Sequence, residues 1–96
     1  MANNLPRDIV LTATFKKAVK DRTKVFHPRF IEAIYHLMND LPLAESFVDH
    51  PLVNVQAGIR ECHIKPDLLL VYQKQDNDLI LLFLTNHNDL SKQLNK

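Results

Sequence analysis

Two short turn-like segments divide residues 59–84 into three segments suited to β-strands, and this pattern constrains the fold more than any other feature. Residues 59–64 can form one strand, and the apolar runs at residues 68–72 and 79–84 can form two more. The segments between them, residues 65–67 and 75–78, have the composition of turns. Because consecutive strands joined by short turns lie antiparallel, we expect a three-stranded meander.

Before Pro42 the spacing of apolar residues is helical. Apolar side chains recur every three or four positions over residues 11–22, which predicts one amphipathic helix with Thr12 or Thr14 as its N-cap. A second helix is expected to begin at Pro28, which needs no hydrogen bond there, and to end before Pro42. The apolar face predicted for this second helix comprises Phe30, Ile31, Ile34, Leu37, Met38 and Leu41.

The remaining segments complete an expected α+β fold. Residues 7–11 are suited to a short first strand, and residues 43–58 are expected to form an extended loop containing the only glycine, Gly58. We therefore predict an antiparallel sheet, made of the N-terminal strand and the C-terminal three-strand meander, packed against an N-terminal helical hairpin. A length of 96 residues fits a single domain spanning residues 1–96.

The composition narrows the classes of protein that the chain can belong to. It is 46% hydrophobic, yet no apolar run approaches the roughly 18 residues of a membrane span. The first residues show no basic cluster followed by an apolar stretch, so no signal peptide is expected. The one cysteine, Cys62, cannot form an internal disulfide and fits best as a small buried hydrophobe. These features predict a cytoplasmic protein with no membrane partner.

The net charge of +1 conceals a basic segment. Residues 7–29 contain seven of the 12 lysines and arginines, opposed only by Asp8 and Asp21. Such a segment can dock on a phosphate backbone or on an acidic partner. It can equally be the solvated face of a helix, and charge alone does not separate these interpretations.

Three histidines and one acid lie where loops meet the predicted strands: His50, His63, Asp67 and His87. A hairpin would bring His63 and Asp67 together at the end of the sheet. Histidines suit metal-free RNA cleavage, because one group must accept the proton of the ribose 2′-OH while another protonates the leaving 5′-oxygen. A cation such as Arg60 or Lys65 would stabilise the transition state.

Two other interpretations of the same residues remain open. Three histidines and a carboxylate can also bind zinc, although no His-x-x-x-His spacing is present. A lone histidine, moreover, is more often an ordinary surface or core residue than a catalyst.

The motifs taken together resemble one family. They are Asp-His-Pro-Leu at residues 49–52, Gly58-x-Arg60, then His63, Pro66-Asp67, Tyr72 and His87. This order and spacing resemble the YafQ-type toxins of the RelE/ParE superfamily. The resemblance implies a RelE-like fold and a type II toxin that cleaves messenger RNA within codons on the ribosome, without metal or cofactor. It also implies a DinJ-like antitoxin as partner, with DNA contacted only indirectly through that antitoxin.

The resemblance further assigns roles to individual residues. His87 would be the general acid, His63 and Asp67 would activate or position the 2′-OH, and His50 would contact the scissile region. The cations expected to contact RNA are Arg60, Lys65, Lys16, Lys17 and Lys20.

Three positions depart from the family pattern. The chain has Phe83 where the family usually has an arginine, Leu68 where an aromatic often follows the aspartate, and Ser91 where the family often ends in an aromatic. The missing arginine motivates an alternative function, that of a degenerate toxin that binds the ribosome or antitoxin without cutting.

Overall fold

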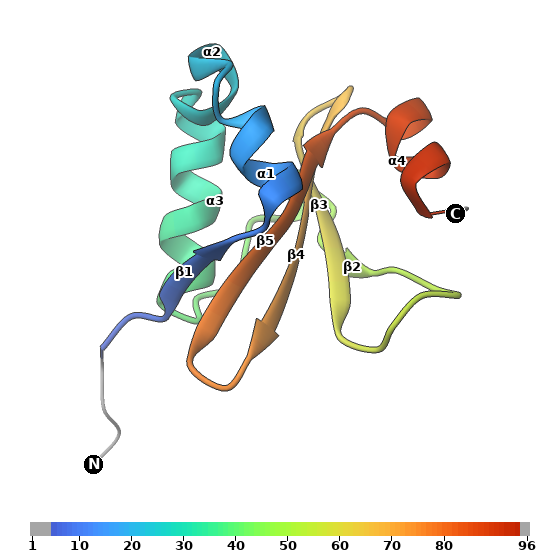
Figure 1. Ribbon diagram of the computed structural model, residues 1–96. Coiled ribbons are helices and arrows are strands. Elements are labelled where there is room, and N and C mark those ends of the chain that lie inside the picture. The colour runs from blue at the N-terminus through green and yellow to red at the C-terminus, as the bar shows by residue number, and fades with distance from the viewer. Residues whose placement is uncertain (1–4, 95–96) are drawn as a thin grey trace.

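A five-stranded sheet runs through the part of the chain that the structure, a computed structural model, describes, residues 5–94 (Figure 1). The strand order is β1-β5-β4-β3-β2. The strands are β1 (Asp8–Leu11), β2 (His50–Pro51), β3 (Ile59–Lys65), β4 (Leu68–Gln75) and β5 (Asp78–Thr85). The predicted meander is therefore confirmed as β3, β4 and β5, each slightly longer than expected.

Helices cover both faces of this sheet (Figure 1). They are α1 (Ala13–Ala18), α2 (Arg22–Val25), α3 (Pro28–Met38) and α4 (His87–Leu94). The first three lie on one face, and α4 lies on the other. No helix within residues 5–94 is long and apolar enough to cross a membrane.

The helix predicted over residues 11–22 is wrong in its extent, because the chain breaks after Ala18. Thr12 caps α1 as predicted, accepting a hydrogen bond from the Phe15 amide. Asp21 then starts a new helix, since its carboxylate accepts from the amide and hydroxyl of Thr23 at 3.1 and 2.6 Å. These hydrogen bonds, the hydroxyl bond foremost, lower the pKa of Asp21. An aspartate cap therefore overrides the continuous apolar spacing.

The direction of β1 also corrects the expected sheet. β3, β4 and β5 are antiparallel to one another, but β1 runs parallel to β5, so the sheet is mixed. The chain leaves β1 directly into α1, which packs on β5 near the end where β5 finishes. This packing requires β1 and β5 to run in the same direction, which no local pattern in the sequence encodes.

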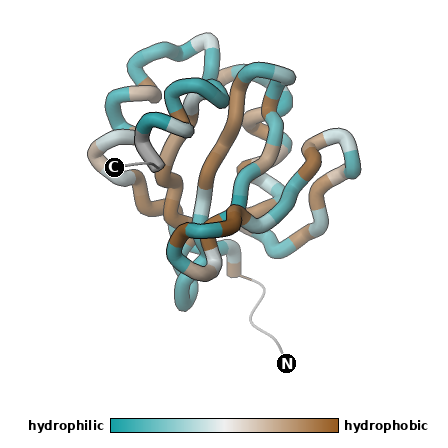
Figure 2. The backbone as a smooth tube through the Cα atoms, turned by 90° about the vertical axis from the view of Figure 1, so that its right-hand side faces the viewer, coloured by the Kyte–Doolittle hydropathy of each residue, from teal (hydrophilic) through white to brown (hydrophobic). Residues whose placement is uncertain are grey.

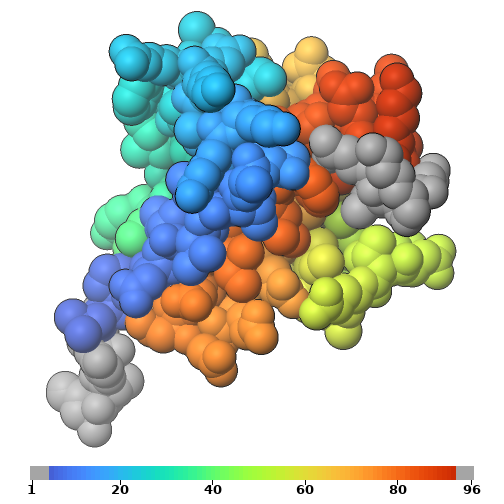
Figure 3. Space-filling view, in the orientation of Figure 1, coloured from blue at the N-terminus to red at the C-terminus, as the bar shows by residue number. Residues whose placement is uncertain are grey.

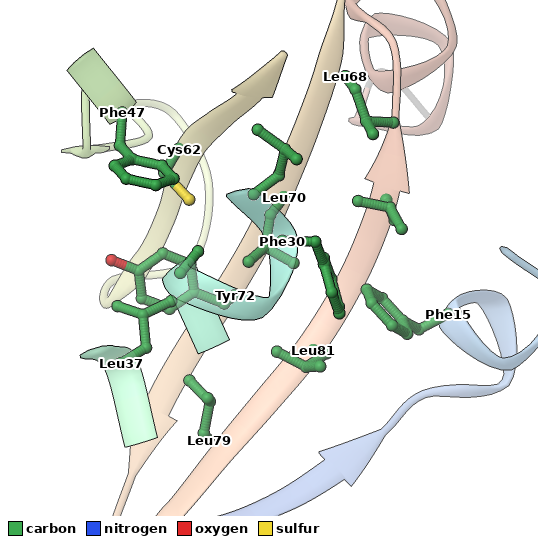
Figure 4. Close-up of a cluster of buried hydrophobic side chains, with 13 residues drawn as sticks. Phe15, Phe30, Leu37, Phe47, Cys62, Leu68, Leu70, Tyr72, Leu79 and Leu81 are labelled. Atoms are coloured by element: carbon green, nitrogen blue, oxygen red, sulfur yellow. The ribbon is translucent and has the colours of Figure 1, made fainter. Parts of the chain in front are cut away.

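The main core lies between the sheet and helices α1 and α3 (Figure 4). Phe15 of α1 and Phe30 of α3 stack with ring centroids 6.3 Å apart. Cys62 is fully buried among them as predicted, and desolvation raises the pKa of its thiol to about 12. The predicted face of α3 is partly wrong, since Ile31 is 53% exposed and Leu41 is 42% exposed.

A smaller core lies on the other face of the sheet. Leu69 and Val71 of β4 pack there against Leu90 of α4, with Phe83 at the margin. In Figure 2 the strands are largely hydrophobic while α4 is mainly hydrophilic, so α4 attaches through few residues. No helix was predicted from the sequence after the third strand of the meander; among the described side chains of α4, Leu90 is the buried one, which gives little periodic signal.

The expected loop over residues 43–58 contains two short elements. The 3₁₀ helix η1 (Glu45–Phe47) buries Phe47, and β2 pairs with the first part of β3. The segment around β2 projects from the body of the molecule below α4, as the yellow-green surface in Figure 3 shows. β2 pairs only with Arg60 and Glu61, so within residues 5–94 the outer edge of β3 beyond Glu61 has no neighbouring strand.

Candidate active site

The pairing of the strands decides which predicted site residues share a face. Glu61 pairs with Val71, His63 pairs with Leu69, and both partners belong to the small core under α4. Paired residues point to the same face of a sheet, so Glu61 and His63 lie on the α4 side. His50 pairs with Glu61 from β2 and joins them there. The fold thus gathers side chains from two strands and one helix.

His63 and His87 are neighbours in space. Their ring centroids lie 5.5 Å apart with planes inclined at 64°. His87 begins α4, and Asn86 holds this helix end in place because its side chain accepts a hydrogen bond from the Asp89 amide at 2.8 Å. His87 is exposed while His63 is half-buried, so the two rings meet at the surface.

His50 lies beside a buried acid. Its Nε2 is 3.9 Å from Oε2 of Glu61, and its Nδ1 is 3.0 Å from the Pro51 carbonyl oxygen. Glu61 is only 5% exposed and has no side-chain hydrogen bond among residues 5–94. Glu61 was not among the site residues predicted from the sequence. The signal was present, because an acid two positions before His63 in a strand must share its face.

The same group has the donors of a metal site. One ligand atom each from His50, Glu61 and His63 lies within 4.8 Å of the others. Two imidazoles and a carboxylate suit zinc or copper. The metal site left open by the sequence is thus geometrically feasible, with Glu61 in the place expected for Asp67.

Asp67 does not join this group. It lines a separate polar hollow at the β3–β4 turn, and no hydrogen bond or ion pair links it to His63 among the described residues. The hollow is lined by Asp21, Thr23, Lys24, Lys65, Asp67, Leu68 and Asn86. Among the described residues, His63 and Asp67 thus share no hydrogen bond or ion pair, and Asp67 shares its hollow with residues of α2 instead. Lys65 lines this hollow and also the one beside His63.

Arg60 points away from the histidines. It pairs with Tyr72 on β4, whose side chain belongs to the main core on the opposite face. Its guanidinium donates to both carboxylate oxygens of Asp49 at 3.3 Å, and the Tyr72 hydroxyl donates to Asp49 at 2.6 Å. Burial, reinforced by the bond to Asp49, raises the pKa of Tyr72. The motif residues Asp49, Arg60 and Tyr72 thus form a hydrogen-bonded scaffold beneath β2.

Of the lysines expected to contact RNA, Lys16 and Lys17 lie on α1 and Lys20 lies two residues beyond its end. All three are exposed. Lys17 lines a hollow with Phe83 and Thr85, close to where β5 leads into α4. Of the three, Lys17 is therefore the one beside the position where the family arginine is missing.

Comparison with known proteins identifies the class and then the family. A toxin from Helicobacter pylori, solved with bound metal, superposes with a TM-score of 0.78 at 36% identity, covering 88% of this chain and 98% of that one. The YafQ chain of the Escherichia coli DinJ–YafQ complex superposes with a TM-score of 0.75 at 32% identity, covering 88% and 97%. The fold is therefore that of small bacterial toxins, and the expected RelE-like α+β class is confirmed.

Sequence comparison gives the family itself. Residues 7–92 match the model of the bacterial toxin of the type II toxin–antitoxin system, YafQ. The mRNA interferase toxin YafQ of E. coli strain B is 34% identical over 77 residues, 75% of this chain and 82% of that protein. The chain belongs to the YafQ family of type II toxins.

Proposed function

We propose that this protein is an endoribonuclease toxin that cleaves messenger RNA within codons on the ribosome, by metal-independent acid–base catalysis. The observation that carries the proposal is the pair of histidine rings, His63 and His87, 5.5 Å apart at the surface. The mRNA interferase relatives support the substrate class.

The chemistry requires two proton transfers. The ribose 2′-oxygen loses its proton to a base and attacks the adjacent phosphorus, and the bond from phosphorus to the 5′-oxygen breaks. The products are a 2′,3′-cyclic phosphate and a 5′-hydroxyl, whose proton comes from an acid. We assign the acid role to exposed His87. His63 is the base, with Glu61 and His50 beside it to orient the ring and the 2′-OH.

The developing negative charge on the phosphate needs a cation. Phe83 supplies none, and Arg60 is bound to Asp49 on the other face. Two lysines are candidates for this cation. Lys17 lines a hollow with Phe83, and Lys65 lines a hollow with His63. Lysine is a weaker phosphate clamp than the bidentate arginine, so we expect slower cleavage than in relatives that have it.

We further propose a DinJ-like antitoxin as the cognate partner. The relative from E. coli is solved as a complex of DinJ with YafQ. The basic side chains of α1 and α2 favour a partner segment with acidic residues. DNA would be contacted only through the antitoxin. Asp67, in the polar hollow beside α2, would position RNA rather than contact His63.

A second candidate is a metal-dependent hydrolase built on His50, Glu61 and His63. The observation that favours it is their donor atoms within 4.8 Å, together with a relative solved with bound metal. A metal held there would bind the unprotonated ring nitrogen of His63. His63 could then not accept the proton of the 2′-OH. Metal analysis of the purified protein, with cleavage measured after a zinc chelator, separates the two: stoichiometric metal and abolished cleavage would favour the hydrolase.

The proposal is tested in cells by toxicity and by mapping messenger RNA ends. His63→Ala and His87→Ala should each relieve growth inhibition and remove new 5′ ends inside codons. His36→Ala is the matched control, because His36 lies on α3, across the sheet from the site. Equal toxicity of all variants would refute the assigned chemistry. Inhibited translation with intact message would instead support the non-cutting toxin.

A further inference from the structure

We propose that Arg29 is a positioning residue that fixes His63 for catalysis without touching RNA, an inference that rests on the proposed function. Arg29 is the second residue of α3, on the face of the sheet that α1 and α3 cover. Its side chain crosses the edge of the sheet and binds the backbone of β3 at His63 itself.

The backbone of β3 needs such support at this position. The register between β3 and β4 shifts between His63 and Lys65, so Ile64 is an extra residue in the ladder. The outer edge has no strand here either, because β2 ends opposite Arg60 and Glu61. Within residues 5–94, a carbonyl group of His63 or Ile64 that faces this outer edge therefore has no donor from a neighbouring strand, and such a group needs another partner.

Arg29 supplies the missing donors. Its Nε donates to the Ile64 carbonyl at 2.7 Å, and one Nη donates to the His63 carbonyl at 2.9 Å. The same guanidinium donates to the hydroxyl and carbonyl oxygens of Ser46 at 3.1 and 3.2 Å. A single planar group thus links the irregular part of β3, at His63 and Ile64, to Ser46 of η1. The rigid fork of an arginine suits this task, whereas the single amine of a lysine does not.

The guanidinium is itself held from two sides. It lies 3.9 Å above the centroid of the Phe47 ring, which is fully buried. The amide of Arg29 donates to Nδ1 of His27, the cap of α3, which fixes the start of the helix. The anchor is therefore rigid, and the position of His63 relative to His87 depends on it.

The experiment uses the full chain with Arg29→Met and Arg29→Lys. Arg7→Met is the matched control, because the Arg7 guanidinium also binds a backbone carbonyl, that of Asp76, and a side chain, that of Asp40, at the other end of the sheet. Cleavage of a defined message on programmed ribosomes gives kcat and KM. Two-bond ¹H–¹⁵N spectra of the histidine rings report the environment of His63 without any activity.

Misplacement of a catalytic group by about 1 Å can cost about 100-fold in rate, so we expect Arg29→Met to lower kcat about 10- to 100-fold with KM unchanged. Arg29→Lys should recover part of this loss, and Arg7→Met should change neither constant. The His63 ring signals should shift in both Arg29 variants and stay in place in the Arg7 variant.

Several results would overturn the inference. An unchanged kcat in Arg29→Met would do so, and so would a raised KM with unchanged kcat, which would indicate direct RNA contact. If the unaltered toxin cleaves nothing, the proposed function fails, and the ring spectra alone decide the structural part. Unshifted His63 signals in Arg29→Met would then refute the positioning role.

Discussion

Replacement of Tyr72 by phenylalanine tests the scaffold that supports the candidate site. The Tyr72 side chain is 1% exposed, and its hydroxyl donates to Asp49 at 2.6 Å. Tyr72→Phe keeps the ring in the core and removes the hydroxyl that donates this hydrogen bond. Asp49 would then keep Arg60 as its partner, at 3.3 Å. The substitution therefore isolates one bond to a carboxylate immediately before His50.

A hydrogen bond to a charged group contributes about 1.5–3 kcal/mol net. Because Arg60 still neutralises the carboxylate, we expect a loss of about 2 kcal/mol in the free energy of unfolding, a drop of roughly 8–16 °C in Tm for a domain of this size. The loss also has a predicted pH dependence. The raised pKa of Tyr72 means that its contribution is fully present below the unfolded value of 10.0 and is lost as pH rises above it.

Urea unfolding followed by circular dichroism measures this change, with Tyr35→Phe as the matched control. Tyr35 is 60% exposed on α3, and its hydroxyl makes no hydrogen bond within residues 5–94, so its loss should have almost no effect. The m-value should stay constant if only the native contact is lost. A loss below about 0.5 kcal/mol for Tyr72→Phe, the range of ordinary surface substitutions, would refute the reasoning.

Three further predictions follow from the same contacts. Cys62, buried with a pKa of about 12, should resist alkylation in the native protein at about pH 8 and react only on unfolding, as a thiol assay with and without denaturant can show. Asp40 has a pKa lowered to about 2 by hydrogen bonds from Arg7 and then Lys74, so it stabilises the fold above the unfolded value of 3.8. Asp40→Asn should therefore be less stable at neutral pH, and urea titrations should show the difference vanishing as pH falls through about 2. Glu61→Gln should lower kcat while the protein stays folded, and an unchanged cleavage rate would remove Glu61 from the site.

The sequence predicted the fold best where the signals were local. The start of α3 at Pro28 and the three strands of the meander depend on short-range spacing and turn residues, and these predictions are confirmed. The direction of β1, by contrast, depends on α1 packing onto β5, which is a long-range contact. β2 has two residues, too few to give a period, and Leu90 is the buried residue among the described side chains of α4.

The candidate site was predictable in its histidines and less so in its acids. The family motif includes His50, His63 and His87. Their proximity, however, becomes visible only with the strand register. Asp67 was expected beside His63 because a hairpin brings its ends close, yet the bulge and turn direct it into another hollow. Glu61 was missed because an acid inside a strand is usually exposed, whereas here Glu61 pairs with His50 and is only 5% exposed.

The most direct test of the proposed function is cleavage of a defined message on purified, programmed ribosomes. The toxin would be freed of metal beforehand with a chelator, and ribosome integrity would be checked because ribosomes need magnesium. Under the proposed function we expect cuts in phase with codons by the native toxin, persisting after metal removal and absent with His87→Ala. An intact message on toxin-bound ribosomes, or equal cutting by the His87→Ala variant, would contradict it.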